Sequence, residues 1–147
     1  MVTIRPLTTS DRHDWLALWS GYLAFYETAL DDATTDATFA RLVDSESSMH
    51  AALARDENDT VIGLVQWVTH PATWSTGDYC YLEDLFVSPD ARGGGTGRAL
   101  IEHVRAWAAD ERCAKVYWLT AESNSVAREL YDRVATRSGM IQYQIRL

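Results

Sequence analysis

The segment Arg92-Gly93-Gly94-Gly95-Thr96-Gly97-Arg98 has the composition of a loop that binds phosphate groups. It follows an apolar run at residues 79–87 and precedes a run with apolar residues at helical spacing, so it joins a predicted strand to a predicted helix. Glycines let backbone N–H groups approach a ligand without a Cβ in the way, and the first turn of a helix leaves further N–H groups unpaired. The segment therefore predicts an anion site at the start of the helix.

Two common phosphate-binding loops are excluded by the spacing. A Walker loop ends in Gly-Lys followed by Ser or Thr, whereas Gly97 is followed by Arg98 and Ala99. A dinucleotide fingerprint that starts at Gly95 needs a glycine or alanine five positions later, where Leu100 stands. The loop is therefore not expected to bind a nucleoside triphosphate or a dinucleotide in either of these ways.

The pattern that fits is Arg-x-x-Gly-x-Gly over Arg92, Gly95 and Gly97, which resembles the acetyl-CoA pyrophosphate loop of the GCN5-related N-acetyltransferase (GNAT) family. Residues 124–131 are similar to a second pattern of that family, Asn-x-x-Ala-x-x-x-Tyr. The resemblance implies that acetyl-CoA is the cosubstrate. No metal is expected, because the cysteines and histidines show no metal-ligand spacing. The residues that the resemblance implies for binding acetyl-CoA are Leu85, Phe86, Val87, Arg92, Gly93, Gly94, Gly95, Thr96, Gly97, Arg98, Asn124 and Tyr131.

Tyr131 is the candidate general acid. Aminolysis of a thioester expels a thiolate whose conjugate thiol has a pKa of about 8.5, and a neighbouring phenol can donate a proton to it. The alternative is a helix tyrosine that packs through its ring and leaves its hydroxyl in water. The position of Tyr131 in the second pattern favours the catalytic role.

Glu83 is the candidate base. An alkylammonium group, with a pKa of about 10.4, must lose a proton before its nitrogen can attack a thioester. The segment at residues 81–87 resembles the diamine and polyamine, Hpa2-like branch of the family, and this match selects Glu83. Adjacent strand residues face opposite ways, so Asp84 is expected to line the other face or to bond the neighbouring backbone. The alternative role for Glu83 is to bind the acceptor without taking its proton.

The acceptor side is predicted from aromatic and acidic residues. Aromatic and apolar residues at helical spacing indicate a helix over residues 11–26, with Trp15, Trp19 and Tyr22 expected in the core. Trp74 stands between two hydroxyl residues with no core periodicity to explain it. It is therefore predicted, together with Glu27 and Glu83, to bind the acceptor amine.

The positions of these side chains depend on the order of the helices and strands, which the sequence predicts to be β-α-α-β-β-β-α-β-α-β. This order indicates an α/β (α+β) fold of the GNAT type, with a mixed, mostly antiparallel central sheet and helices on both faces. The β-α-β crossover makes strands 79–87 and 116–120 parallel neighbours. Residues 28–36 are predicted to be a loop that precedes a short helix. The strands are expected at 2–7, 49–55, 61–69, 79–87, 116–120 and 141–147, and the helices at 11–26, 37–44, after the glycine loop and after Asn124.

Composition and charge limit the remaining classes of protein. The chain has 147 residues, 47% of them hydrophobic, which predicts one N-acetyltransferase domain over residues 1–147. The sequence shows no signal peptide and no membrane-spanning run, so a cytoplasmic protein without membrane contact is expected. A net charge of −8 argues against nucleic acid as a partner. Residues 1–70 hold 4 basic and 11 acidic side chains, whereas residues 71–147 hold 9 and 10, so the first half favours a cationic acceptor.

The sequence therefore predicts an acetyl-CoA-dependent N-acetyltransferase that transfers the acetyl group directly to a primary amine. The expected acceptor is a cationic small molecule such as a polyamine or a diamino acid, and no acetyl-enzyme is expected on Cys80 or Cys113. Two alternatives stay open: a lysine acetyltransferase that acts on proteins or histone tails, and a non-catalytic sensor module that binds acetyl-CoA. The resemblance also implies a homodimer, in which the terminal strand could pair with a second copy.

Overall fold

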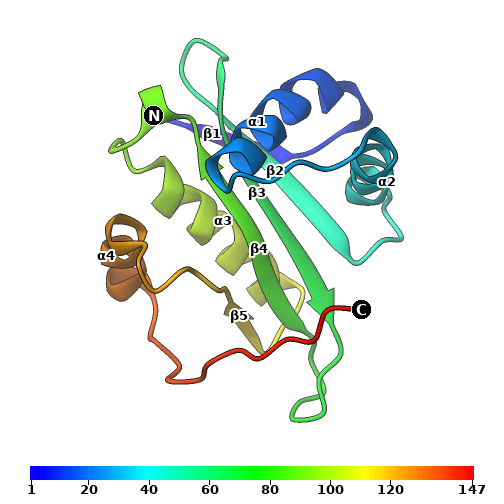
Figure 1. Cartoon of the computed structure of the whole chain (residues 1–147), viewed down its shortest axis with the longest axis vertical. Coiled ribbons are helices and arrows are strands. Elements are labelled where there is room, and N and C mark those ends of the chain that lie inside the picture. Colours follow the sequence, from blue (N-terminus) through cyan, green and yellow to red (C-terminus); the bar gives the residue numbers. More distant parts are fainter.

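A five-stranded sheet forms the centre of the computed structural model, which describes all 147 residues. The strands lie in the order β1-β2-β3-β4-β5, so each pairs with its neighbours in sequence (Figure 1). The first three pairings are antiparallel and the pairing of β4 with β5 is parallel, as predicted. The strands are β1 (Thr3–Pro6), β2 (Met49–Arg55), β3 (Val61–His70), β4 (Tyr79–Val87) and β5 (Lys115–Tyr117).

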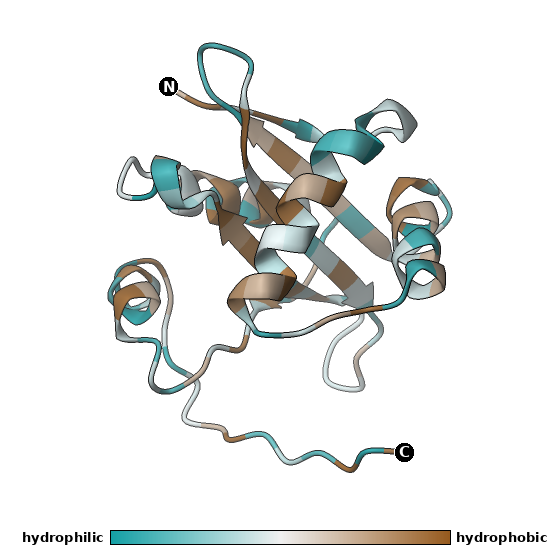
Figure 2. Ribbon diagram, turned by 45° about the horizontal axis from the view of Figure 1, so that its top comes forward, coloured by the Kyte–Doolittle hydropathy of each residue, from teal (hydrophilic) through white to brown (hydrophobic).

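Helices cover both faces of the sheet, which confirms the predicted fold class. The helices are α1 (Arg12–Phe25), α2 (Asp32–Val43), α3 (Thr96–Asp110) and α4 (Ser125–Val134). One core, which includes Trp15, Phe39 and Leu64, lies between the sheet and helices α1 and α2. Helix α1 crosses the front of the sheet in Figure 2, and the other core, which includes Val65 and Leu100, lies on the opposite face beneath α3. No helix combines the length and the apolar character that crossing a bilayer requires.

The second helix begins earlier than the sequence predicts. Residues 28–36 are predicted to be a loop, yet α2 begins at Asp32. The Asp31 carboxylate accepts a hydrogen bond of 2.7 Å from the Thr34 N–H group and so caps the helix. The first turn faces solvent and needs no apolar residue, which is why hydrophobic spacing does not detect it.

The predicted strand at Ile141–Leu147 is not formed, which corrects the sequence prediction. Residues 135–147 form neither helix nor strand. Ile141, Tyr143 and Ile145 are 77–89% exposed. Alternating apolar residues form a strand only beside a partner edge, and β5 contains just three residues. The predicted strand at 116–120 is shorter for a related reason, because its pairing ends at Tyr117.

Asp11 fixes the start of α1 against β1. Its carboxylate accepts two hydrogen bonds from the Arg5 guanidinium, at 2.9 and 3.0 Å, and one of 2.8 Å from the Thr8 N–H group. The Asp11 side chain is 4% exposed. The Arg5 hydrogen bonds lower the pKa of Asp11 to about 2. Asp11 therefore determines where α1 lies on the sheet.

We expect Asp11→Asn to lower the free energy of unfolding at pH 7 by about 1–3 kcal/mol, because the buried carboxylate loses its charge and one of its two acceptor oxygens for the Arg5 guanidinium. The pKa of Asp11 lies below its unfolded value, so its contribution is present above about pH 4. It is lost as the pH falls toward about 2, the folded pKa. Urea unfolding measured at a series of pH values checks this. The difference in the free energy of unfolding between wild type and variant should become smaller as the pH falls over this range.

Asp36→Asn is the matched control, because Asp36 is an exposed carboxylate that pairs with Arg12. We expect this change to have little effect on stability. An equal loss in both variants, or a gap for Asp11→Asn that does not change with pH, would contradict the role given to Asp11.

Candidate active site

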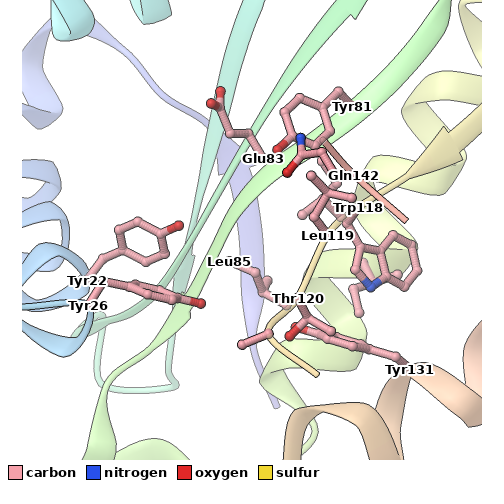
Figure 3. A pocket seen from close by; sticks show the side chains of 13 residues that line it. Tyr22, Tyr26, Tyr81, Glu83, Leu85, Trp118, Leu119, Thr120, Tyr131 and Gln142 are labelled. Atoms are coloured by element: carbon pink, nitrogen blue, oxygen red, sulfur yellow. The ribbon is translucent and has the colours of Figure 1, made fainter. Parts of the chain in front are cut away.

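β4 and β5 pair over only three residues and then separate. The pairing runs from Tyr79 with Lys115 to Tyr81 with Tyr117. Beyond this pairing, β4 continues to Val87, whereas the segment that follows β5 leaves the sheet toward α4. A cavity of about 330 Å³ opens between the diverging segments (Figure 3). Its lining residues are Tyr22, Tyr26, Tyr81, Leu82, Glu83, Leu85, Ile101, Trp118, Leu119, Thr120, Ala121, Tyr131 and Gln142.

A β-bulge at Glu83 changes the direction in which β4 residues face. Asp84 pairs with Gln66 of β3, and Leu82 pairs with the next residue of β3, so Glu83 has no partner across the ladder. Leu82 packs into the core beneath α3, whereas Phe86 packs into the core beneath α1 and α2. In a regular strand these two residues would face the same way, so the bulge reverses the alternation.

Glu83 lines the cavity at this bulge (Figure 3). The residue is exposed, so its carboxyl can exchange protons with solvent. Partial desolvation and the charge of Asp84 raise the pKa of Glu83, and Arg41 of α2 opposes them. A carboxylate with a raised pKa is a stronger proton acceptor than an ordinary surface glutamate.

Asp84 bonds a side chain of the adjacent strand β3 rather than the neighbouring backbone. The Gln66 amide donates a hydrogen bond of 2.8 Å to the Asp84 carboxylate. Burial raises the pKa of Asp84, while hydrogen bonds from Tyr22 and Gln66 lower it in part. Asp84 is therefore a desolvated acid directly beside the cavity wall.

Tyrosine hydroxyls reach the cavity from two sides. Tyr131 of α4 lies opposite Tyr22 and Tyr26 of α1 (Figure 3). The Tyr131 ring packs edge-on against Trp118, with 5.4 Å between centroids. Burial raises the pKa of Tyr131. The phenol is therefore protonated at neutral pH and available as a hydrogen-bond donor.

The glycine loop leaves backbone donors unpaired at the start of α3. Gly95 precedes the helix with a left-handed φ of 84°, which a residue with a Cβ rarely adopts. The first helical hydrogen bond of this end runs from Ala99 N–H to the Gly95 carbonyl. The N–H groups of Thr96, Gly97 and Arg98 thus have no partner within the helix and can hold phosphate oxygens.

The two arginines of this loop are placed differently. Arg92 donates a hydrogen bond of 3.0 Å to the Val87 carbonyl, and its guanidinium lies over the rings of Phe25 and Phe86. Arg92 therefore joins the end of β4 to the end of α1. Arg98 is exposed in the first turn of α3, where its charge adds to that of the free N–H groups.

The backbone of β4 beyond the split has one paired edge and one open edge. Leu85, Phe86 and Val87 pair with β3 on one side, while β5 does not extend to them on the other. An extended ligand could therefore lie along β4 as an added strand, apart from the Val87 carbonyl that Arg92 occupies. The open edge, the cavity and the glycine loop together fit an extended molecule with phosphates at one end.

The remaining residues that the sequence predicts for cofactor or acceptor binding lie outside the cavity. Asn124 precedes α4, and its amide donates to the Thr120 hydroxyl at 3.3 Å. Gly93 and Gly94 are exposed in the loop. Glu27 is exposed just after α1 and does not line the cavity. Trp74, which is 90% exposed in the loop between β3 and β4, does not line it either.

Sequence reasoning missed most of the cavity wall. Tyr22 is expected in the core, yet its hydroxyl end reaches the cavity, and Tyr26 joins it one helical turn later. The sequence gives no indication that Tyr81, Trp118 or Gln142 belongs to a site. The tyrosine pair at the end of a helix was the available signal, since Tyr and Trp keep a polar end toward water. No three His, Cys, Asp or Glu side chains gather closely enough to hold a metal ion.

Three comparisons relate the chain to known proteins. The sequence model of the acetyltransferase (GNAT) family matches residues 15–135. D-amino-acid N-acetyltransferase HPA3 of Saccharomyces cerevisiae is 32% identical over 144 residues, 97% of this chain and 89% of that protein. Thialysine N-epsilon-acetyltransferase of Sus scrofa is 36% identical over 66 residues, 45% of this chain and 38% of that protein. A structure of AAC(6')-Iy with a CoA bisubstrate analogue has a TM-score of 0.85 at 17% identity, covering 100% of this chain and 99% of the other.

We expect Gly95→Ala to weaken the binding of CoA about tenfold, because a Cβ in the left-handed region costs about 1–2 kcal/mol and shifts the free N–H groups. Isothermal titration calorimetry with CoA measures this loss. Gly139→Ala is the matched control, since Gly139 has a similar φ of 79° in the segment after α4. Equal losses in both variants, or no loss in either, would contradict a phosphate site at the glycine loop.

Proposed function

The chain belongs to the acetyltransferase (GNAT) family and is an N-acetyltransferase, and we propose that it transfers the acetyl group of acetyl-CoA directly to the primary amine of a cationic small molecule. The observation that carries this proposal is the cavity at the split of β4 and β5. A candidate base, Glu83, and a candidate acid, Tyr131, both line it. The open edge of β4 and the N-terminus of α3 supply contacts for the pantetheine arm and the phosphates.

The walls of the cavity support a cationic acceptor. The lining residues include the Glu83 carboxylate and the rings of Tyr22, Tyr26 and Tyr81, but no lysine or arginine. A carboxylate and aromatic faces attract an alkylammonium group. The two relatives named above as acting on D-amino acids and on thialysine support an amine acceptor of small size. A polyamine or a diamino acid combines both properties.

In the proposed reaction the ammonium group first transfers a proton to Glu83, and the neutral nitrogen then attacks the thioester carbonyl. A C–N bond forms and the carbonyl oxygen becomes an oxyanion, which an unpaired N–H group on the open edge of β4 can stabilise. The C–S bond breaks as the intermediate collapses. Tyr131 donates its proton to the departing sulfur, and the nitrogen, which is still positively charged after the attack, loses its second proton to solvent. Solvent then returns a proton to Tyr131 and takes the first proton from Glu83, so one proton is released overall. The products are the amide and free CoA.

Cys80 is a poor nucleophile, which supports direct transfer without an acetyl-enzyme. The residue is fully buried in the core beneath α3. Burial raises the pKa of its thiol to about 12, so almost none is thiolate at neutral pH. Cys113 does not line the cavity, and burial raises its pKa as well. Neither cysteine is therefore placed to carry an acetyl group.

A panel of acceptors tests the proposed substrate class. We expect kcat/KM for a polyamine or a diamino acid to exceed that for a neutral monoamino acid at least about tenfold, as one charge-assisted hydrogen bond would provide. Thiol release from acetyl-CoA is measured with spermidine, thialysine, several D-amino acids and a lysine-rich peptide side by side. Preference for neutral or acidic amines would refute the cationic class. Preference for the peptide would favour a protein lysine acetyltransferase.

We expect Tyr131→Phe to lower kcat about 100-fold or more with little change in KM for the amine, because the departing thiolate loses its proton donor. Single-turnover thiol release measures the chemical step. Tyr143→Phe is the control, since Tyr143 is 88% exposed and does not line the cavity. If Tyr131→Phe keeps the wild-type rate, the tyrosine is not the acid. If neither the wild-type protein nor the variants release thiol faster than the uncatalysed rate with any amine, the protein is a sensor module and not an enzyme.

A further inference from the structure

A buried chain of hydrogen bonds lies beneath the acceptor side of the cavity. The Trp15 indole N–H of α1 donates to Gln66 Oε1 of β3 at 2.8 Å. The Gln66 Nε2 group donates to Asp84 Oδ2 of β4 at 2.8 Å. Trp15 is 0% exposed and Gln66 is 4% exposed. Beyond Asp84 lies Tyr22, which lowers the pKa of this carboxyl as a hydrogen-bond donor and which lines the cavity.

The chemistry of Trp15 fixes the direction of every bond in this chain. An indole N–H can only donate, so the oxygen of the Gln66 amide must face it. The amide nitrogen must then face Asp84, whose carboxylate can only accept. A Tyr22 hydroxyl that approaches this carboxylate can only donate its one proton to it. Its oxygen lone pairs are left as hydrogen-bond acceptors for a molecule in the cavity.

The Asp84 carboxylate has no cationic partner. None of the ion pairs in the structure includes it. A desolvated carboxylate held by neutral donors alone costs free energy, and groups of this kind gather at functional sites. The charge that it lacks could come from an acceptor that carries an ammonium group. An ammonium group bound in the adjacent cavity would balance the charge of Asp84.

The ring of Tyr22 is held in one place by its neighbours. It stacks on Trp19 with 5.2 Å between centroids and an angle of 10°. It also meets Tyr26 at 4.9 Å and the edge of Phe86 at 6.3 Å. The hydroxyl can therefore turn only its proton, and Asp84 determines where the proton points. Figure 3 shows the hydroxyl end of Tyr22 directed toward the cavity from α1.

We propose that Tyr22 is a specificity-determining residue, and that Trp15, Gln66 and Asp84 are positioning residues that hold its hydroxyl as a hydrogen-bond acceptor for the substrate. The ammonium group of the acceptor then donates one N–H to Glu83 and a second to the Tyr22 oxygen. The site selects the charged amine before Glu83 removes its proton. This inference rests on the proposed function, because it concerns the acceptor of the same reaction.

The test compares two acceptors of the same shape and different charge. Butylamine is an ammonium ion at neutral pH, whereas O-propylhydroxylamine has the same length and is neutral. We expect Tyr22→Phe to raise KM for butylamine about tenfold or more, the effect of losing a hydrogen bond to a charged group. We expect kcat with butylamine, KM for O-propylhydroxylamine and KM for acetyl-CoA to change less than about twofold. Tyr143→Phe should change none of them.

Asp84→Asn and Trp15→Phe test the positioning chain. An asparagine amide can donate to Tyr22 and turn the hydroxyl proton toward the cavity, so Asp84→Asn should raise KM for butylamine like Tyr22→Phe. Trp15→Phe keeps a buried ring but frees the Gln66 amide to turn, and a smaller rise in the same KM is expected. Thermal unfolding shows whether each variant is folded. Should Asp84→Asn fail to fold, Tyr22→Phe decides alone, since it removes one hydroxyl from a ring that keeps its packing.

Two results would overturn the inference, and both differ from failure of the proposed function. One is an equal rise in KM for both acceptors after Tyr22→Phe, which indicates a general loss of fit. The other is no rise for either acceptor, which shows that the hydroxyl does not contact the amine. Failure of the proposed function is seen in the unmutated protein, as turnover of the neutral acceptor without turnover of butylamine. That result would also show that the protein does not use the charged amine that Tyr22 is proposed to bind.

Discussion

The parallel pairing of β4 with β5 ends after Tyr81 and Tyr117, and the rest of the site depends on this early end. If the ladder continued, β5 would occupy the open edge of β4 and fill the cavity. The bulge at Glu83 lies two residues beyond the last pair, where it bends β4 and increases its twist. The same bulge brings Glu83 to the cavity wall and sends Asp84 toward α1. One local irregularity therefore accounts for the opening, the candidate base and the buried acid beside it.

The resulting site is electrostatically asymmetric along β4. At the Val87 end, the free N–H groups of α3 and the charge of Arg98 form a region that favours anions. Around the bulge, Glu83 and Asp84 form a region that favours cations. This arrangement suits a reaction between an anionic cosubstrate and a cationic amine.

The sequence predicts the elements well because hydrophobic spacing reports which residues meet the core. It predicts β4 at residues 79–87, and it places the glycine loop before α3 from the two runs that flank it. It cannot predict the bulge, since the apolar pattern of β4 fits either face and only the register with β3 reveals the reversal. Trp74 and Glu27 are a different case, and their role in binding the acceptor stays a prediction. Their residue types suit an amine, but exposed positions carry no periodicity that would place them.

The most direct test of the account is a crystal structure of the protein with CoA joined covalently to an alkylamine. We expect the pantetheine arm to lie along the open edge of β4, with the phosphates at the glycine loop. We also expect the sulfur to lie within hydrogen-bond distance of the Tyr131 hydroxyl and the amine to lie between Glu83 and Tyr22. A pantetheine arm outside the split of β4 and β5, or a sulfur remote from Tyr131, would contradict it.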